Sequence, residues 1–393
     1  MIGIWTFLEW TFMVYLDNAA TTWPKPEMVY STLYSFMKNS CANPGRSAHK
    51  MARISSSLVL KTREALSELF YIQNPLDIAF TANATQALNL AIQGVLRQGD
   101  HVVTTAMEHN SVLRPLYHLK QKGIIDYSVV MPYDSYGNVS PSSIAEAIRP
   151  NTRLIALSSA SNVTGTILPY EEVGEIARTK EILFLVDAAQ GAGVLDLDVK
   201  AMNISLLAFP GHKGLMGPQG TGGLYVAPGV EMRPVLYGGT GSRSFVTIHP
   251  DFMPDMLEAG TVNSPGIAGL GAGLRWLMGV GLDRIRKKKK ILMESFFKEI
   301  GRVSSIRFYS ERDASKNAGI ISLIIPGMDS SEIGNILDQK YGIAVRSGFH
   351  CAPLAHETLG TMKTGLVRIS PGYFNTAQEM EYAARAIREI AGG

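Results

Sequence analysis

The sequence of 393 residues predicts an α/β fold, with a mainly parallel seven-stranded sheet in a large domain and a smaller C-terminal α/β domain. Three observations lead to this prediction. Short apolar runs alternate with segments of helical periodicity through the first two-thirds of the chain, which favours a parallel sheet covered by helices on both faces. The pattern then changes after about Trp276. Polar residues also follow several of the apolar runs, at the carboxyl ends of strands where such sheets bind ligands.

Seven apolar runs supply the predicted strands of the large sheet. In chain order they are DIAFTA from Asp77, HVVTTA from His101, SVVMPY from Ser128, RLIALSS from Arg153, ILFLVD from Ile182, LLAFP from Leu206 and GGLYVA from Gly222. Between these runs, apolar residues recur at helical spacing, for example in residues 54–69, 85–96 and 170–177. This alternation is typical of consecutive strand–helix units.

The last third of the chain predicts the smaller domain, with mixed strands. A long charged helix is expected from Leu277 to about Arg302. The segments that follow are an apolar run at 318–326, a helix from Ser330, apolar runs at 342–348 and 365–371, and a final helix from Thr376. We therefore assign residues 31–276 to the large domain, residues 13–30 and 277–393 to the small domain, and residues 1–12 to an N-terminal extension.

The composition is that of a globular protein, with 46% hydrophobic and 18% charged residues. A formal net charge of +3 is too small to indicate nucleic acid as a partner, and the basic run Arg284–Lys290 is interpreted as a solvated helix face. The first twelve residues are too short to span a bilayer and lack a basic start, so neither export nor membrane insertion is expected. Cys41 and Cys351 lie far apart in sequence, which predicts no disulfide, no metal site and a reducing, cytoplasmic location.

Four clusters of polar residues stand where predicted strands end. Asp187 and Gln190 follow one strand, and Ala84 and Thr85 stand at a strand-to-helix turn whose N–H groups suit a phosphate. The other two clusters are Glu108-His109-Asn110 and His212-Lys213. An aspartate alone could instead cap the next helix. Together, however, these side chains would satisfy pyridoxal phosphate: the lysine attaches it covalently, the carboxylate keeps its ring nitrogen protonated and the imidazole of His109 stacks on the ring.

Longer motifs give the chain a family resemblance. They are YLDNAATTWPKP from Tyr15, SNVTGT at Ser161–Thr166, DAAQ at Asp187–Gln190 and GHKGLMGPQGTGGLYV from Gly211. With these motifs the chain resembles the class V aminotransferase-fold family of cysteine desulfurases and selenocysteine lyases, over nearly its whole length. The resemblance implies a homodimeric fold-type I enzyme that carries pyridoxal phosphate on Lys213.

The resemblance also implies roles for individual residues. Thr85 and His212 would bind the cofactor phosphate, His109 would stack on the ring, Asn162 would lie near the cofactor hydroxyl and the substrate, and Gln190 would contact the ring oxygen. Thr261, in EAGTVN, would reach the phosphate of the neighbouring subunit, so that dimerisation completes the site. Arg368 would bind the substrate α-carboxylate in a bidentate manner.

At two positions the comparison with the family pattern is less direct. His49, in NPGRSAHKMA, matches a family pattern near the active site, although a role at the start of a helix is an alternative. Pro210 departs from the family pattern, which has serine or threonine at this position as a phosphate ligand. Since proline offers neither a hydroxyl nor an N–H, we expect weaker anchoring of the phosphate or a substitute group.

The segment VRSGFHCAP predicts the reaction. Arg346, His350 and Cys351 resemble the RxGxxC pattern of the family branch with a short active-site loop, in which the cysteine accepts sulfur. A thiol is strongly nucleophilic as its thiolate, and Arg346 or a protonated His350 could raise the thiolate fraction. Cys351 taken alone would be a small buried hydrophobe. Without similar neighbours, Cys41 is interpreted as structural, and His118 and His356 as surface or packing residues.

The main functional hypothesis is a cysteine desulfurase, which converts L-cysteine to L-alanine and holds the sulfur as a Cys351 persulfide for a downstream acceptor protein. The alternative is a selenocysteine lyase acting on L-selenocysteine. An epimerase or transaminase would leave the Cys351 motif unexplained, and a non-catalytic protein would be expected to lack Lys213, Asp187 or Arg368. A nicotinamide-dependent dehydrogenase is disfavoured because no GxGxxG turn opens a helix after the first strand.

Overall fold

The structure is a computed structural model that describes residues 13–45, 49–242 and 245–392; the expected N-terminal extension 1–12 lies outside these residues. All seven predicted strands form one sheet, in the order β2-β8-β7-β6-β5-β3-β4. They are β2 (Ile78–Thr81), β3 (Asp100–Thr105), β4 (Ile125–Val130), β5 (Thr152–Ser158), β6 (Leu183–Asp187), β7 (Leu206–Pro210) and β8 (Gly222–Val226). The strands from β7 to β4 pair in parallel, whereas β8 pairs antiparallel with both β7 and β2. The predicted α/β class with a mainly parallel sheet is confirmed.

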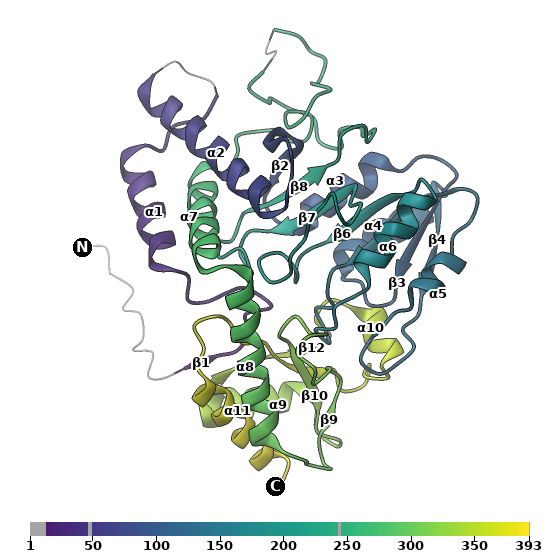
Figure 1. Cartoon of the computed structure of the whole chain (residues 1–393), viewed down its shortest axis with the longest axis vertical. Coiled ribbons are helices and arrows are strands. Elements are labelled where there is room, and N and C mark those ends of the chain that lie inside the picture. Colours follow the sequence, from purple (N-terminus) through teal and green to yellow (C-terminus); the bar gives the residue numbers. More distant parts are fainter. Residues whose placement is uncertain (1–12, 46–48, 243–244, 393) are drawn as a thin grey trace.

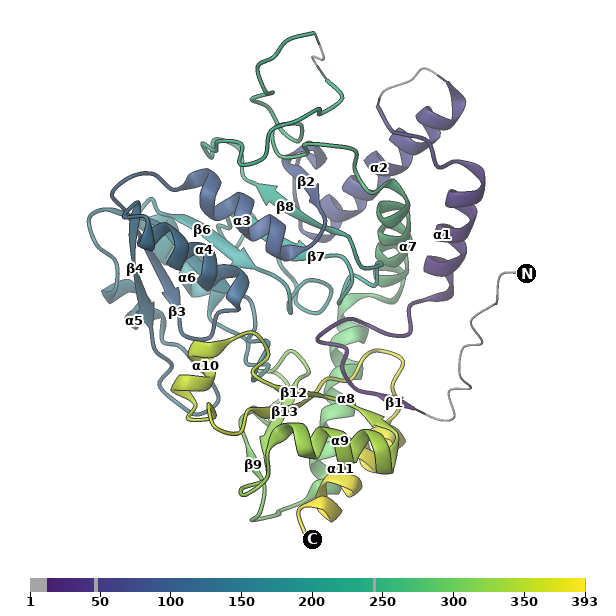
Figure 2. The same ribbon diagram turned by 180° about the vertical axis from the view of Figure 1, so that it is seen from behind.

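Helices cover both faces of this sheet (Figures 1 and 2). Alternate residues of β5 show the two faces, because Leu154 and Ala156 pack in one apolar cluster and Ile155 and Leu157 in another. The first cluster includes residues of α3 (Ala84–Val95) and α4 (Asn110–Gln121). The second includes residues of α2 (Lys50–Leu69), α5 (Pro141–Glu146), α6 (Tyr170–Thr179) and α7 (Ser264–Val280). The short 3₁₀ helix η1 (Pro75–Asp77) leads into β2, and α1 (Glu27–Asn39) packs against α7.

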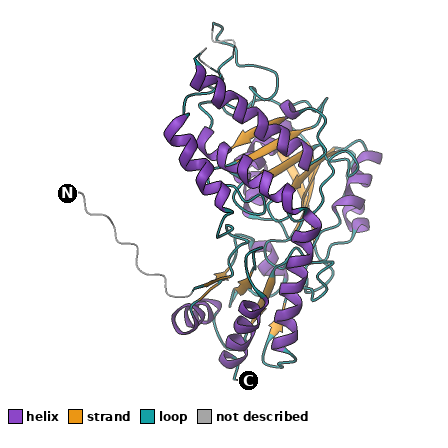
Figure 3. Cartoon of the chain, turned by 60° about the vertical axis from the view of Figure 1, so that its left-hand side comes forward, coloured by secondary structure: helices purple, strands orange, loops and turns teal. Residues whose placement is uncertain are grey.

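The C-terminal part forms a separate α/β layer, seen at the bottom of Figure 3. Its antiparallel sheet has the order β12-β13-β10-β9, and a second, two-stranded sheet pairs β1 in parallel with β11. The elements are β1 (Val14–Tyr15), α8 (Leu282–Ile300), β9 (Arg307–Phe308), β10 (Ile321–Ile324), α9 (Ser330–Tyr341), β11 (Ile343–Ala344), β12 (Arg346–Gly348), α10 (Pro353–Thr358), β13 (Leu366–Ile369) and α11 (Ala377–Ile390). A third apolar cluster joins α8, α9 and α11 to these strands.

The predicted helix from Leu277 to Arg302 is wrong in its start. Leu277 belongs to α7, which ends at Val280, and α8 begins at Leu282. Gly281 separates the two helices with a φ of 85°, a left-handed value that residues with a Cβ rarely adopt. Helical periodicity continues across this glycine, so periodicity alone did not reveal the break. The domain limits remain a proposal, and the pairing of β1 with β11 supports the assignment of the N-terminal strand to the small domain.

The segment after β1 connects the two sheets. Asn18 N–H donates to the carbonyl of Ser370, which follows β13, at 3.0 Å, and Thr22 N–H donates to the carbonyl of His212, which follows β7, at 3.1 Å. This segment therefore lies at the carboxyl end of the large sheet, where the predicted ligand residues stand. Within the described residues, no helix has the length and apolar character that a bilayer crossing requires.

Candidate active site

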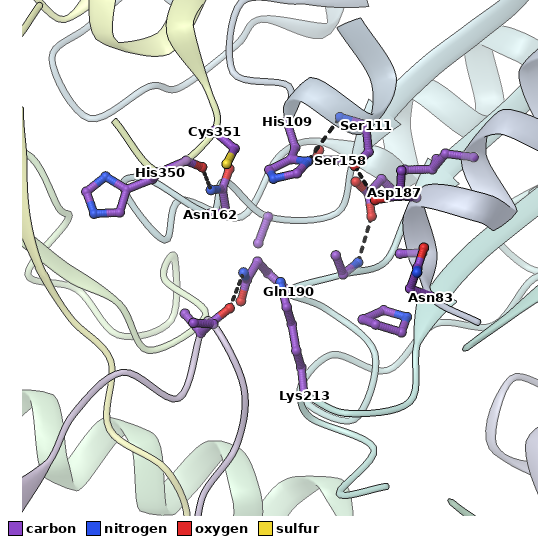
Figure 4. A pocket seen from close by; sticks show the side chains of 18 of the residues that line it. Asn83, His109, Ser111, Ser158, Asn162, Asp187, Gln190, Lys213, His350 and Cys351 are labelled. Atoms are coloured by element: carbon purple, nitrogen blue, oxygen red, sulfur yellow. Dashed lines mark hydrogen bonds between the residues drawn. The ribbon is translucent and has the colours of Figure 1, made fainter. Parts of the chain in front are cut away.

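A cavity at the carboxyl end of the large sheet collects most of the predicted site residues (Figure 4). The predicted residues that line it are Ala84, Thr85, His109, Asn162, Asp187, Gln190, His212, Lys213, Arg346, His350, Cys351 and Arg368. They come from both parts of the chain: Asp187 ends β6 in the large sheet, whereas Arg368 lies on β13. The cavity therefore forms only where the small sheet faces the large one.

The lysine motif places Lys213 on a turn packed against the turn that carries Asp187. A Cβ added at Gly193, which has a φ of 79°, would lie only 2.4 Å from the carbonyl oxygen of Gly214. Glycine at both positions thus allows the two backbones to touch. The Lys213 carbonyl also accepts a bond from Thr22 Oγ1 at 2.9 Å. These contacts explain why a lysine stands among small residues here: the backbone is fixed while the side chain faces the cavity.

Asp187 is buried at the end of β6, and its negative charge interacts with the positive charge of Lys213. One carboxylate oxygen, Oδ1, accepts a bond from Ala189 N–H at 2.8 Å. Burial raises the pKa of Asp187, while the Ala189 bond and the Lys213 charge act in the opposite direction. Burial likewise lowers the pKa of Lys213 to about 8, with a further lowering by Arg368 and an opposing effect of Asp187. A lysine with so low a pKa has a large neutral fraction at mildly alkaline pH, and the neutral amine is the nucleophilic form.

The N-terminus of α3 forms the anion-binding end of the cavity. Asn83 caps the helix, since its side-chain oxygen accepts a bond from Gln86 N–H at 2.9 Å. Thr85 Oγ1 lies 2.7 Å from Ser111 Oγ, so two hydroxyls stand together beside the first turn. Free N–H groups and the helix dipole favour an anion at this position. Pro210 also lines the cavity, which means that the residue departing from the family pattern does face the site.

His109 and His212, two of the three histidines that line the cavity, are neutral at physiological pH. Burial lowers the pKa of His109 to about 4, with Lys213 adding to the effect. His109 caps α4, and its Nδ1 lies 3.0 Å from Ser111 N and 2.9 Å from Ser111 Oγ. Burial, followed by Lys213 and Lys25, lowers the pKa of His212 to about 4 as well. A neutral imidazole held at one nitrogen suits stacking on a flat ring better than a solvated imidazolium would.

Arg368 is buried in the cavity wall and makes two hydrogen bonds to the chain. Its NH2 group donates to Asp17 Oδ1 at 3.0 Å and its NH1 group donates to the carbonyl of Asn162 at 2.9 Å. Its Nε is buried and has no hydrogen-bond partner among the described residues. A guanidinium has five N–H donors, so those that these two bonds do not use suit an acceptor such as a carboxylate in the cavity.

Cys351 lies on a loop with unusual backbone geometry. His350 and Cys351 have φ values of 50° and 56°, each of which costs about 1 kcal/mol or more in a residue with a Cβ. Two hydrogen bonds hold this conformation: Asn162 Nδ2 donates to the His350 carbonyl and Asn110 N–H donates to the Cys351 carbonyl, both at 2.7 Å. In Figure 4 the His350 ring points away from Lys213, and Cys351 and Asn162 both line the cavity.

The suggestion that a protonated His350 supports the Cys351 thiolate is wrong. Burial holds the pKa of His350 far below its usual range, and the charge of Arg368 adds to this lowering. The imidazole is therefore neutral at physiological pH. Arg346 remains as the cation of this motif, and it lines the same cavity as Cys351.

Two predicted residues lie outside the cavity of the single chain. His49 is exposed and caps α2, with Nδ1 accepting a bond from Ala52 N–H at 3.3 Å, which is the alternative that the sequence left open. Thr261 is exposed in the loop before α7 and does not line the cavity. The role assigned to Thr261 requires a second subunit and remains a proposal.

Sequence reasoning missed several residues that support the site. Ser111 contacts both Thr85 and His109, and Lys25 Nζ donates to the His212 carbonyl at 2.6 Å. Ser158, the strand partner of Asp187, lines the cavity and binds the fully buried carboxyl of Glu108. Glu108 was predicted at a strand end but without a role, and Lys25 lies within the first family motif, so its position along the chain was the available signal.

The charges and donors of this cavity fit pyridoxal phosphate. Among the described residues that line it, Asp187 is the single carboxylate, against the cations Lys213, Arg346 and Arg368. This excess of positive charge suits a phosphate and a substrate carboxylate, and the buried Asp187 suits a protonated ring nitrogen. In the part of the chain that the structure describes, no cluster of histidine, cysteine and carboxylate side chains has the arrangement of a metal site.

Comparison with known proteins agrees with this arrangement. The sequence model of the family described as "Aminotransferase class-V" matches residues 14–382. A protein of Methanothermobacter thermautotrophicus named "Probable cysteine desulfurase" is 37% identical over 387 residues, which cover 96% of this chain and 95% of that protein. The apo structure of a cysteine desulfurase from Thermococcus onnurineus NA1 superposes with a TM-score of 0.89 at 32% identity, covering 97% of this chain and 95% of that one. The cysteine desulfurase CsdA from Escherichia coli gives a TM-score of 0.86 at 28% identity, with 96% and 94% covered.

Proposed function

The chain belongs to the class V aminotransferase family, and within it we propose that the protein is a pyridoxal-phosphate-dependent cysteine desulfurase, which moves the sulfur of L-cysteine onto Cys351. The observation that carries this proposal is the presence of Lys213, Asp187 and Cys351 on the wall of one cavity. The fold neighbours and relatives named as cysteine desulfurases support the same activity.

Residues of the chain would hold each part of the cofactor. Lys213 would attach it covalently, and Asp187 would pair with the ring nitrogen. The N-terminus of α3, with Thr85 and His212, would bind the phosphate, and His109 would stack on the ring. When bound, pyridoxal phosphate supplies an electron sink that makes the α-proton and the β-substituent of an amino acid labile.

The residues around Arg368 position the amino-acid substrate. Its free donors bind the α-carboxylate, while Asp17 and the Asn162 carbonyl fix the plane of the guanidinium. Burial lowers the pKa of Lys213 to about 8, so the amine can both accept and donate a proton near neutral pH. This suits Lys213 to remove the α-proton of the substrate and to return a proton to carbon. Both groups line the cavity that contains Cys351.

The sulfur transfer balances without an added oxidant or reductant. The Cys351 thiolate attacks the substrate sulfur, an S–S bond forms and the C–S bond of the substrate breaks. The carbon fragment keeps the electron pair of that bond and takes up one proton, equivalent to the proton that the Cys351 thiol lost, and it leaves as L-alanine. Cys351 becomes a persulfide, and Arg346 lines the same cavity.

We further propose that the persulfide is delivered to an acceptor protein outside the cavity. Cys351 also lines an open groove on the side of α3 and α4, together with Asn89, Gln93, Arg114 and His118. The thiol thus borders both the substrate cavity and a surface that solvent reaches. Since no carboxylate lines this groove among the described residues, an acceptor segment with acidic side chains suits it.

A homodimer with a shared active site is part of the proposal. Thr261 is exposed and does not line the cavity of its own chain, which suits a residue that serves a partner's cofactor. The long loop between β8 and α7, at the top of Figure 1, exposes large apolar side chains that a second copy would cover. Those with half or more of their surface exposed are Tyr237, Phe245 and Ile248. With both cysteines free and separate, we propose a reducing, cytoplasmic location.

The alternative activity, on L-selenocysteine, uses the same residues, and an epimerase or transaminase would give no role to Cys351. The test is to measure alanine and released sulfide from L-cysteine for the wild type, for Cys351→Ser and for Cys41→Ser as a matched control. We expect loss of both products in Cys351→Ser only, with the cofactor absorbance retained. Alanine from L-selenocysteine but not from L-cysteine would instead identify a selenocysteine lyase, and no alanine from either would refute both.

A further inference from the structure

A buried chain of polar side chains stands behind the Cys351 loop. His356 on α10 is fully buried, and its ring stacks on that of His350, with centroids 5.6 Å apart and planes at 14°. His356 Nε2 lies 3.4 Å from His350 Nδ1, and His356 Nδ1 lies 2.8 Å from Thr361 Oγ1. The other ring nitrogen of His350 lies 3.4 Å from the Arg346 carbonyl. The family motif did not include His356, which the sequence suggested only as a surface or packing residue.

The direction of these hydrogen bonds follows from the Arg346 carbonyl. A carbonyl oxygen only accepts, so His350 Nε2 carries the proton, and a neutral His350 then has an acceptor at Nδ1. In the matching tautomer, His356 donates to that acceptor through its own Nε2–H and its Nδ1 faces the Thr361 hydroxyl, whose oxygen also lies 3.4 Å from the His356 carbonyl. Each ring nitrogen of His350 and His356 then has a hydrogen-bond partner while both rings are neutral. His356 is the group that supplies a donor to His350 within this buried region.

We propose that His356 is a positioning residue, which acts through His350 to hold Cys351 in the left-handed conformation that places its thiol on the cavity wall. The inference deepens the proposed desulfurase function and rests on it. His350 and Cys351 are consecutive residues with positive φ, a conformation that needs support from neighbouring contacts. Their carbonyls are held by Asn162 and Asn110, and the side chain of His350 is held by His356.

A matched pair of variants tests the donor rather than the ring. His356→Gln keeps an N–H group close to the position of Nε2, whereas His356→Leu keeps the volume and removes the donor. In the holoenzyme we expect His356→Leu to lower kcat for alanine formation about tenfold with little change in KM for L-cysteine, and His356→Gln to recover most of it. Equal losses in the two variants, or no loss in either, would overturn the proposal.

Amide hydrogen exchange supplies a readout independent of turnover. The N–H of Asn110 is at the start of α4, where it has no helical partner, and it donates to the Cys351 carbonyl at 2.7 Å. If the loop moves in His356→Leu, the peptide 108–112 should exchange faster while a β6 peptide at 183–187 keeps its rate. Unchanged exchange at 108–112 would contradict the positioning role.

Thr361→Val keeps the assay decisive if His356→Leu fails to fold. This variant removes only the hydroxyl that lies 2.8 Å from His356 Nδ1, and we expect a smaller increase in exchange at 108–112 than in His356→Leu. No increase would again overturn the proposal. The exchange result also stands apart from the proposed function: a wild-type protein that made no alanine from L-cysteine would refute the desulfurase activity, while local exchange would still report on the loop.

Discussion

Replacing Glu108 by glutamine removes a buried ionisable group beside the cavity and keeps its shape. Glu108 is fully buried, and its oxygens accept bonds from Thr105 Oγ1 at 2.7 Å and from Ser158 Oγ at 2.6 Å. Burial is the main reason that its pKa is raised from 4.5 to about 7, and the charge of Asp187 is the smallest contribution. A bound cofactor that neutralises Asp187 therefore changes this pKa little.

The raised pKa makes the stability of the protein depend on pH. The folded protein binds this proton more tightly than the unfolded chain, so the contribution to stability is fully present below about pH 4.5 and is lost as pH rises through about 7. The difference between the two pKa values corresponds to about 3 kcal/mol of unfolding free energy. Glutamine does not titrate, so the wild type should lose about 2 to 3 kcal/mol relative to Glu108→Gln between pH 5 and pH 8.

Urea denaturation of both proteins, followed by tryptophan fluorescence at equal protein concentration, measures this difference. Other titrating groups are common to the two proteins and cancel when their unfolding free energies are subtracted. Glu108→Gln should also keep most of its activity, because the carboxyl does not line the cavity. A difference between the proteins that stays constant from pH 5 to pH 8 would refute the reasoning.

Two further variants test the ends of the cavity. Arg368→Lys loses bidentate binding of the carboxylate and the bond to Asn162, so kcat/KM for L-cysteine should fall by about 30-fold or more in steady-state assays; a change below about threefold would remove Arg368 from this role. Pro210→Ser restores the hydroxyl of the family pattern at the phosphate end, and transfer of the cofactor to a scavenging apoenzyme should slow by about tenfold. An unchanged release rate would show that Pro210 does not face the phosphate.

The sequence predicted the strands better than their directions. Each of the seven apolar runs overlaps a strand, and the clearest of them, β6, β7 and β8, are buried on both faces and therefore almost continuously apolar. β4, at the edge of the sheet, is mostly half-buried. The antiparallel direction of β8 depends on the short return from β7 through the lysine turn, and an apolar run reads the same in either direction. The break at Gly281 was missed for a similar reason, since one glycine does not interrupt the apolar period.

A site residue was predicted when it stands at the polar end of a strand or lies within a family motif. Ser111, Ser158 and His356 were missed because each acts by a hydrogen bond to a side chain that becomes its neighbour only in the folded chain. His49 could not be separated from a helix cap, since both roles use a histidine at the start of α2. Burial also decided the charge of His350, and no local pattern of residues indicates how deeply one side chain is buried.

The pairing of Asp17 with Arg368 has a consequence for how the protein is made. The two residues are 351 positions apart, and β1 likewise pairs with a strand near the other end of the chain. A ribosome that adds about 5–20 residues per second needs roughly 18 to 70 seconds to reach Arg368 after Asp17 has been synthesised. Lys213 and Asp187 emerge well before that. The cofactor-binding residues can therefore come together on the nascent chain, whereas the Asp17–Arg368 pair that positions the substrate carboxylate forms only as synthesis ends.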